Sequence, residues 1–178
     1  MNGVVFAFFG HPGAGKSTLC RRFGELCDVP AIDTDALMTP AEVAAVESGR
    51  YTQTMRLANV RRYCRRARSL LRSEGCVAIA DGLPNAESRR FLREQLASAE
   101  VVFVLVTVPR ALWEARLAAR SGNAVNIGIA AAEAYVRENW EEIEPSPAHE
   151  TIENGADGEA TDAALQVLYR RHVPAASG

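Results

Sequence analysis

Residues 10–17 form a glycine-rich octapeptide that constrains this chain more than any other feature. It matches the pattern G-x-x-x-x-G-K-[ST] at every fixed position, with the residues Gly10, His11, Pro12, Gly13, Ala14, Gly15, Lys16 and Ser17. The apolar run Val4–Phe9 precedes it, and a helical pattern follows it. Glycines let successive backbone N–H groups turn inward toward phosphate oxygens, beside the positive end of the helix. We therefore expect a phosphate-binding loop between a buried strand and a helix.

The side chains of this loop predict which groups it binds. Lys16 is expected to reach the β and γ phosphates of ATP, and Ser17 to offer its hydroxyl to Mg²⁺. We also count Thr18, the next residue of the helix, among the nucleotide contacts. Lys16 is the only lysine in a chain whose Lys+Arg total is 20. A single lysine at this position suggests chemistry that arginine cannot supply.

Beyond the loop, strand-like apolar runs alternate with helical patterns, which indicates an α/β fold. We expect a central parallel sheet of about five strands, covered by helices on both faces. The expected strands are Val4–Phe9, Val29–Ile32, Cys76–Ala80, Val101–Val106 and Thr151–Glu153. The expected helices are Lys16–Leu26, a short one capped by Thr39, Thr52–Ser73, Asn85–Ser98, one from Pro109 to about Ser121, one ending near Glu142, and Glu159–Arg171. Because no linker divides the chain, we expect one domain over residues 1–178.

Composition excludes several classes of partner. The net charge of −2 over 178 residues gives no whole-protein attraction to nucleic acid or to acidic membranes. Val4–Phe9 is too short for a signal-peptide core or a membrane span. We expect a cytoplasmic protein that acts on a small molecule and has no membrane partner, and the charge disfavours nucleic acid as a partner. A homodimer remains an open alternative to a monomer.

Three aspartates lie where strands are expected to end, and ligands of open α/β sheets bind at that edge. Asp33 and Asp35 follow the second strand, and Asp81 with Gly82 follows the third. One carboxylate could accept the proton of an attacking hydroxyl while another orients metal-bound water. Asp81 is placed to hold Mg²⁺ through water, and Gly82 lets the backbone approach a ligand. The alternatives are helix caps for Asp33 and Asp35, and a turn residue for Asp81.

Arginines offer a second set of candidates. Arg116 and Arg120 lie four residues apart on one expected helix face, where they could clamp the transferring phosphoryl group. The alternative is a solvated helix face. The long helix carries a stripe of Arg61, Arg65, Arg68 and Arg72, which we interpret mainly as a solvated face. Arg56 or Arg61 could bind a separate anionic group of the acceptor.

Several segments resemble small-molecule kinases related to shikimate, gluconate, adenylylsulfate and adenylate kinases, over about residues 4–155. Asp33-Thr34-Asp35 is similar to the D-T-D of shikimate kinase, and residues 80–84 resemble the D-G-F-P segment of adenylate kinase. Residues 114–120 resemble the E-R-L-x-x-R start of the lid in these kinases. The resemblance implies that Asp35 is the base or acceptor anchor and that Asp33 lies nearer the metal. It also implies the strand order 2-3-1-4-5 and a lid near residues 116–135.

The chain also departs from each of these kinases. Asp81-Gly82-Leu83 stands where shikimate kinase has a glycine triplet, and Ala36-Leu37-Met38 stands where adenylylsulfate kinase carries arginine or asparagine. The resemblance therefore implies the fold and phosphoryl transfer, and it does not name the acceptor. The carboxylates of Asp33 and Asp35 favour transfer of the γ-phosphate of MgATP to a hydroxyl group of a small molecule. The alternatives are a nucleoside, nucleotide or 5′-hydroxyl polynucleotide kinase, and an ATPase that acts as a nucleotide-dependent switch. With one lysine, the guanine-reading pattern N-K-x-D is absent from the chain.

Overall fold

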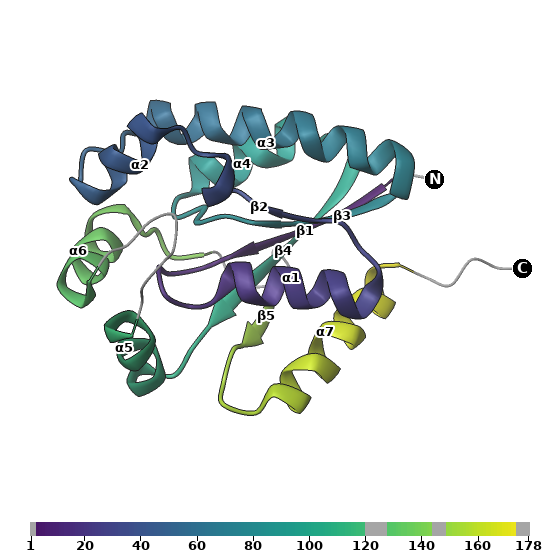
Figure 1. Ribbon diagram of the computed structural model, residues 1–178. Coiled ribbons are helices and arrows are strands. Elements are labelled where there is room, and N and C mark those ends of the chain that lie inside the picture. Colours follow the sequence, from purple (N-terminus) through teal and green to yellow (C-terminus); the bar gives the residue numbers. More distant parts are fainter. Residues whose placement is uncertain (1–2, 120–127, 144–148, 174–178) are drawn as a thin grey trace, which may run out of the picture.

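The computed structural model describes residues 3–119, 128–143 and 149–173. Five parallel strands form one sheet in the order β2-β3-β1-β4-β5, which confirms the expected fold and strand order (Figure 1). The strands are β1 (Gly3–Phe9), β2 (Ala31–Asp33), β3 (Cys76–Ala80), β4 (Ala99–Thr107) and β5 (Glu150–Glu153). β2 begins at Ala31 rather than Val29, because the Val29 N–H bonds to the Gly24 carbonyl and Pro30 has no N–H to donate.

Helices connect the strands, and their ends follow local signals in the sequence. Thr39 and Glu42 form a reciprocal capping box, and Gly75 ends the long helix in a left-handed conformation, φ 73°. Asn85 caps the next helix by accepting from the Ser88 N–H. The helices are α1 (Lys16–Cys27), the 3₁₀ helix η1 (Asp35–Leu37), α2 (Pro40–Glu47), α3 (Gln53–Glu74), α4 (Ala86–Gln95), α5 (Arg110–Ala118), α6 (Ile129–Asn139) and α7 (Gly158–His172).

Each face of the sheet has its own hydrophobic core, so the molecule has three layers. On one face, Phe6 and Phe8 of β1 pack with Phe23 of α1, and α7 completes this layer (Figure 1). On the other face, Phe9 packs among buried residues of α3 and α4, including Tyr63. Adjacent residues of a strand point to opposite faces, which is why the continuous run of β1 is apolar throughout.

The apolar and arginine stripes of helix α3 differ in burial. Its buried positions include Val60, Cys64 and Ala67 of the expected apolar stripe. Arg61, Arg65 and Arg72 are exposed, which confirms a solvated face for most of the arginine stripe. Arg68 is half-buried, and its Nη1 donates to the Gln95 carbonyl at the end of α4 at 2.7 Å.

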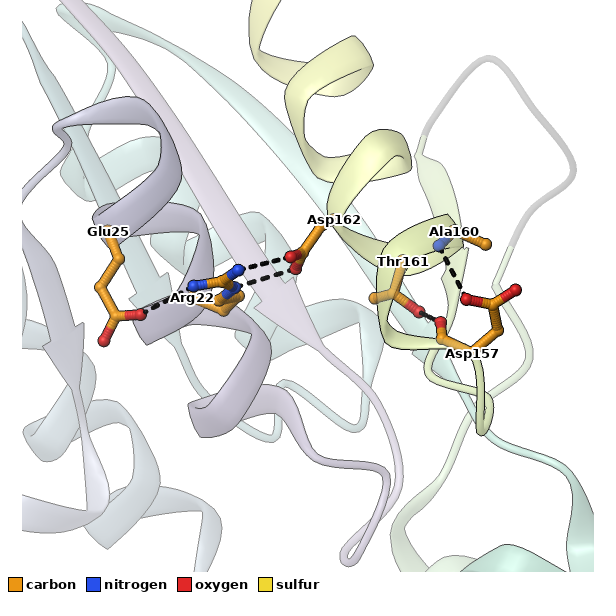
Figure 2. Close-up of polar contacts among 6 residues, drawn as sticks. All are labelled: Arg22, Glu25, Asp157, Ala160, Thr161 and Asp162. Atoms are coloured by element: carbon orange, nitrogen blue, oxygen red, sulfur yellow. Dashed lines mark hydrogen bonds and ion pairs between the residues drawn. The ribbon is translucent and has the colours of Figure 1, made fainter.

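Helix α7 is held against α1 by charged groups at the surface (Figure 2). The guanidinium of Arg22 donates from Nε to Asp162 at 2.9 Å and also pairs with Glu25 of its own helix. Asp157 caps α7 by accepting from the Ala160 N–H at 3.0 Å.

Three elements gather at the carboxyl ends of the strands, namely α2, α5 and α6 (Figure 1). The expected lid over residues 116–135 includes the end of α5 and part of α6. Its middle, with Arg120, lies outside the described residues. Within the three described ranges, no helix is long and apolar enough to cross a bilayer.

Candidate active site

The glycine-rich loop follows β1 directly, and its glycines are required by close packing as well as by backbone conformation. Gly15 has φ +90°, and a Cβ there would lie 2.1 Å from Nδ2 of Asn154. At Gly10, a Cβ would lie 2.5 Å from the Val106 carbonyl oxygen of β4. The indole Nε1 of Trp113 donates to the Pro12 carbonyl at 2.6 Å and holds α5 against the loop. The loop is therefore packed tightly against Val106, Trp113 and Asn154, and a ligand can bind on the side of the loop that faces the cavity.

Lys16 begins helix α1, and its Nζ donates to the His11 carbonyl across the loop at 3.0 Å. The first N–H groups of a helix have no partner within the helix, so those of α1 are available to an anion. Ser17 and Thr18 follow in the first turn and line the same cavity as Lys16. The structure thus brings together an ammonium, a hydroxyl and helix N–H groups, as the motif predicts.

A cavity of about 490 Å³ extends from this loop along the carboxyl ends of β2 and β3. It brings together most of the site residues expected from the sequence: Gly10, Pro12, Gly13, Gly15, Lys16, Ser17, Thr18, Asp33, Asp35, Arg56, Asp81, Gly82 and Arg116. Its other lining residues are Ala36, Met38, Val46, Tyr51, Asn59, Ala80, Tyr135 and Asn154.

His11 and Ala14 lie elsewhere, because their side chains line a second cavity behind the loop, beside Trp113 and Trp140. The His11 ring packs edge-on against Trp140, with 4.4 Å between the ring centroids. Burial, with a smaller effect of the Lys16 charge, lowers the pKa of His11, which favours a neutral imidazole.

Asp33 and Asp35 sit at the end of β2, on a turn anchored from two sides. The Asp35 N–H donates to Oδ1 of Asp33 at 3.2 Å, while the buried Thr34 hydroxyl donates to the Ala80 carbonyl at 2.8 Å. Arg62 of α3 donates to the Leu37 carbonyl at 2.9 Å and also binds Glu42. The backbone of the turn that carries both aspartates therefore has a defined place at the cavity wall.

The Arg62–Glu42 ion pair joins α2 to α3 in a partly buried setting. Its two hydrogen bonds measure 2.9 and 3.0 Å. Burial raises the pKa of Glu42, but hydrogen bonds from Arg62 and Thr39 outweigh it and leave that pKa below its usual value. Glu42 is therefore ionised at neutral pH and fixes the segment that follows Asp35.

Asp81 is held by two donors at the end of β3. The hydroxyl of Tyr63, on α3, donates to Oδ2 at 2.6 Å, and the Gly82 N–H donates to Oδ1 at 2.7 Å. Tyr63 is fully buried, and burial together with the Asp81 charge raises its pKa well above the usual value. The tyrosine therefore stays protonated and orients the carboxylate, whose oxygens retain lone pairs for a ligand.

Arg116 reaches the cavity from the end of α5 and meets a residue that the sequence analysis missed. Its Nη2 donates to Oδ1 of Asn154 at 3.3 Å and to the Gly155 carbonyl at 3.4 Å. Its Nη1 is buried without a hydrogen-bond partner in the described part of the chain. Burial lowers the pKa of Arg116. An unpaired buried guanidinium nitrogen beside a phosphate loop suits an anionic ligand.

Asn154 connects this arginine to the loop. Its side chain is 8% exposed, and its Nδ2 donates to the Ala14 carbonyl at 2.8 Å. It directly follows β5, so the rule that ligands bind beyond strand ends would have found it if applied to the fifth strand. Asn154 therefore links the loop, α5 and the β5 edge through one amide.

Tyr51, Arg56 and Tyr135 also line the cavity, and neither tyrosine was predicted. The Arg56 guanidinium lies 5.2 Å from the centroid of the Tyr51 ring and 5.8 Å from that of Tyr135. Arg61 does not line this cavity; it is exposed, and its guanidinium lies 5.1 Å from the centroid of the Phe91 ring. Five residues along a helix correspond to a rotation of about 140°, so the two arginines face different sides of α3.

The donor set fits MgATP. In the described part of the chain Arg116 Nη1 has no hydrogen-bond partner, and a phosphate oxygen beside the N-terminus of α1 would satisfy it. Across the described ranges, no group of three or more His, Cys, Asp or Glu side chains could hold a metal ion by itself. Mg²⁺ in such sites is bound by few protein groups together with phosphates, and Ser17, Asp33 and Asp81 offer one hydroxyl and two carboxylates.

Comparison with known families agrees with this geometry. A family model described as an AAA domain matches residues 5–142, which is most of the chain. The chain belongs to that family. No curated protein matches the sequence of this AAA domain protein.

Several of the solved structures similar to this AAA domain protein are kinases. A sugar kinase from Janibacter sp. has TM-score 0.74 and 18% identity, with 98% of each chain covered. A gluconokinase from Sinorhizobium meliloti has TM-score 0.71 and 20% identity, covering 96% of this chain and 95% of the other. The Mycobacterium tuberculosis APS kinase in complex with AMPPNP and APS has TM-score 0.60 and 19% identity, covering 94% and 95%. The resemblance to P-loop small-molecule kinases is therefore confirmed at the level of the fold.

Proposed function

We propose that this protein is an ATP-dependent kinase that transfers the γ-phosphoryl group of MgATP to a hydroxyl group of a small-molecule acceptor. One observation carries the proposal: a single cavity is lined by the P-loop lysine, two carboxylates and a half-buried arginine, namely Lys16, Asp35, Asp81 and Arg116. A phosphate loop alone serves many nucleotide hydrolases. Carboxylates facing it at the ends of β2 and β3 favour an acceptor whose hydroxyl must lose a proton.

In this proposal the chain's own residues position and neutralise the reacting groups. Lys16 and Arg116 offset charge on the phosphates, and Ser17, Asp33 and Asp81 hold Mg²⁺ directly or through water. Asp35 accepts the proton of the acceptor hydroxyl while the hydroxyl oxygen forms its bond to the γ-phosphorus. At the same time the bond between the γ-phosphorus and the bridging oxygen of ADP breaks. Kinases among the similar structures support this proposal, and the APS kinase structure carries AMPPNP.

The decisive experiment measures ADP release over a panel of hydroxyl-bearing small molecules, beside a control without acceptor. We expect acceptor-dependent turnover, and we expect Lys16→Ala to remove it while the variant stays folded. Lys16→Arg should also fail, because a planar guanidinium replaces a compact ammonium in a tightly packed loop. Arg21→Ala is the matched control, since Arg21 is exposed on the same helix and does not line the cavity.

Two results would replace the proposal by another function. ADP release that no acceptor stimulates would indicate an ATPase that acts as a switch. Phosphorylation of a nucleoside monophosphate on its phosphate would indicate a nucleotide kinase. Near-normal acceptor-dependent turnover in Lys16→Ala would refute any role of this loop in phosphoryl transfer.

A further inference from the structure

We propose that the second cavity, which lies behind the phosphate loop, binds an uncharged planar heteroaromatic molecule distinct from the nucleotide and from the acceptor. The cavity has a volume of about 940 Å³, within the range of about 300–1,000 Å³ that is typical of small-molecule sites. Its wall includes His11 and Ala14 of the loop and residues of β4, α5 and α6. No described residue lines both this cavity and the one that contains Lys16, so the inference does not depend on the proposed kinase function.

Aromatic side chains form much of this wall, namely His11, Trp113, Trp140 and His149. The His11 ring meets Trp140 edge-on, with 4.4 Å between the ring centroids. The buried Phe9 ring is stacked on Trp140 at an interplanar angle of 14° and meets His149 edge-on. These contacts hold the rings of Trp140 and His149 in place. Because aromatic groups prefer to contact one another by face or edge, such a wall suits a planar ring system.

The charged groups around the cavity balance in number. Two arginines, Arg110 and Arg137, and two glutamates, Glu133 and Glu142, line it. Arg110 is already paired with Glu133, which joins α5 to α6. Burial lowers the pKa of His11, so its ring adds no charge at neutral pH. A charged ligand would leave water without meeting a surplus of opposite charge, which is unfavourable. The lining therefore favours an uncharged molecule.

His149 supplies a polar atom without a partner. Its Nδ1 is buried and forms no hydrogen bond within the described part of the chain. Buried polar atoms are nearly always hydrogen-bonded, because a group that has lost its water and gained no partner destabilises the protein. An imidazole nitrogen donates or accepts according to its tautomer, so a ring N–H or a ring nitrogen of a ligand would satisfy it. This atom favours a heteroaromatic ligand over a hydrocarbon.

The test uses two uncharged probes, benzimidazole and 4-quinazolinone, each beside a carboxylate derivative of the same ring system. Binding is measured by calorimetry at mildly alkaline pH, without nucleotide and again with excess MgADP. Tryptophan fluorescence reports on this cavity, because both tryptophans of the chain, Trp113 and Trp140, line it.

We expect at least one uncharged probe to bind with a Kd below about 1 mM and to change the fluorescence. Its carboxylate derivative should bind at least about fivefold more weakly, because the added charge must leave water. Excess MgADP should leave the affinity of the probe within about twofold of its value without nucleotide, because the phosphate loop has a separate cavity on its other side.

Variants assign the binding to this cavity. His149→Phe keeps a ring edge-on to Phe9 and removes Nδ1, so the probe should bind about threefold or more weakly. Trp140→Leu keeps an apolar side chain and removes the ring, with an expected loss of about two- to tenfold. His172→Phe is the matched control, since His172 also meets a phenylalanine edge-on but lies outside the cavity. Circular dichroism and thermal melting check that each variant is folded.

Three outcomes would overturn the inference. The first is that neither uncharged probe binds with a Kd below about 1 mM, or that binding leaves the fluorescence unchanged. The second is displacement of the probe by MgADP, which would mean that the probe occupies the nucleotide site. The third is a carboxylate derivative that binds as tightly as its parent, or an affinity that survives both His149→Phe and Trp140→Leu or is lost in His172→Phe.

Discussion

Replacing Asn154 by alanine should weaken both the P-loop and the arginine that faces it. The amide donates to the Ala14 carbonyl at 2.8 Å, a neutral bond worth about 1 kcal/mol. It also accepts from Arg116 at 3.3 Å, a bond to a charged group that we place near about 1.5 kcal/mol because it is long. Asn154→Ala removes both and leaves a buried carbonyl without its partner. We expect the free energy of unfolding to fall by about 2–3 kcal/mol, measured by urea denaturation.

The same change should slow the reaction more than it weakens ATP binding. If the roughly 1.5 kcal/mol that orients Arg116 acts in the transition state, its loss lowers kcat about tenfold. Arg116→Ala should lower kcat at least as much, because it removes the cation itself. The assay is steady-state ADP release with the best acceptor from the panel, with kcat and the KM for ATP determined separately.

A control variant and a double-mutant cycle separate the two contacts. Asn154→Asp keeps an acceptor for Arg116 but places a carboxylate against the Ala14 carbonyl, so its main effect should be a higher KM for ATP. In a cycle of Asn154→Ala with Arg116→Ala, we expect a coupling energy above about 0.5 kcal/mol. Additive effects on kcat would refute the reasoning, because they would mean that Asn154 does not act through Arg116.

Two further variants test the carboxylates. Asp35→Asn keeps the shape of the side chain but removes the base. We therefore expect kcat to fall at least about tenfold on the true acceptor, while ATP affinity is unchanged. An unimpaired variant would show that Asp35 is not the base. Tyr63→Phe removes the 2.6 Å bond to Asp81, which should lower the free energy of unfolding by about 1.5–3 kcal/mol and raise the Mg²⁺ concentration needed for half-maximal rate. A loss below about 0.5 kcal/mol together with an unchanged Mg²⁺ dependence would contradict the positioning role of Tyr63.

The phosphate end of the site was predictable because its signals are local. A turn that brings N–H groups around a phosphate needs glycines at fixed spacing, and the neighbouring strand and helix are encoded by their own apolar patterns. Helix ends at Thr39, Gly75 and Asn85 were predictable for the same reason, since a cap involves residues within one turn. The clamp role of Arg116 and Arg120 stays a prediction, and Arg120 lies outside the described residues.

The sequence by itself thus determined the phosphate loop, the α/β alternation and the aspartates at strand ends. Tertiary structure decided the rest of the site: Tyr51 and Tyr135 come from segments far apart in the chain, and Asn154 reaches Ala14 across 140 residues of sequence. It also decided that Arg56 lines the cavity and Arg61 does not, although both are arginines of the same helix. The physical reason is that phosphate binding uses backbone groups of one continuous segment. An acceptor site is formed instead where side chains from several elements converge. Only the packing of the elements determines which side of a helix faces that site.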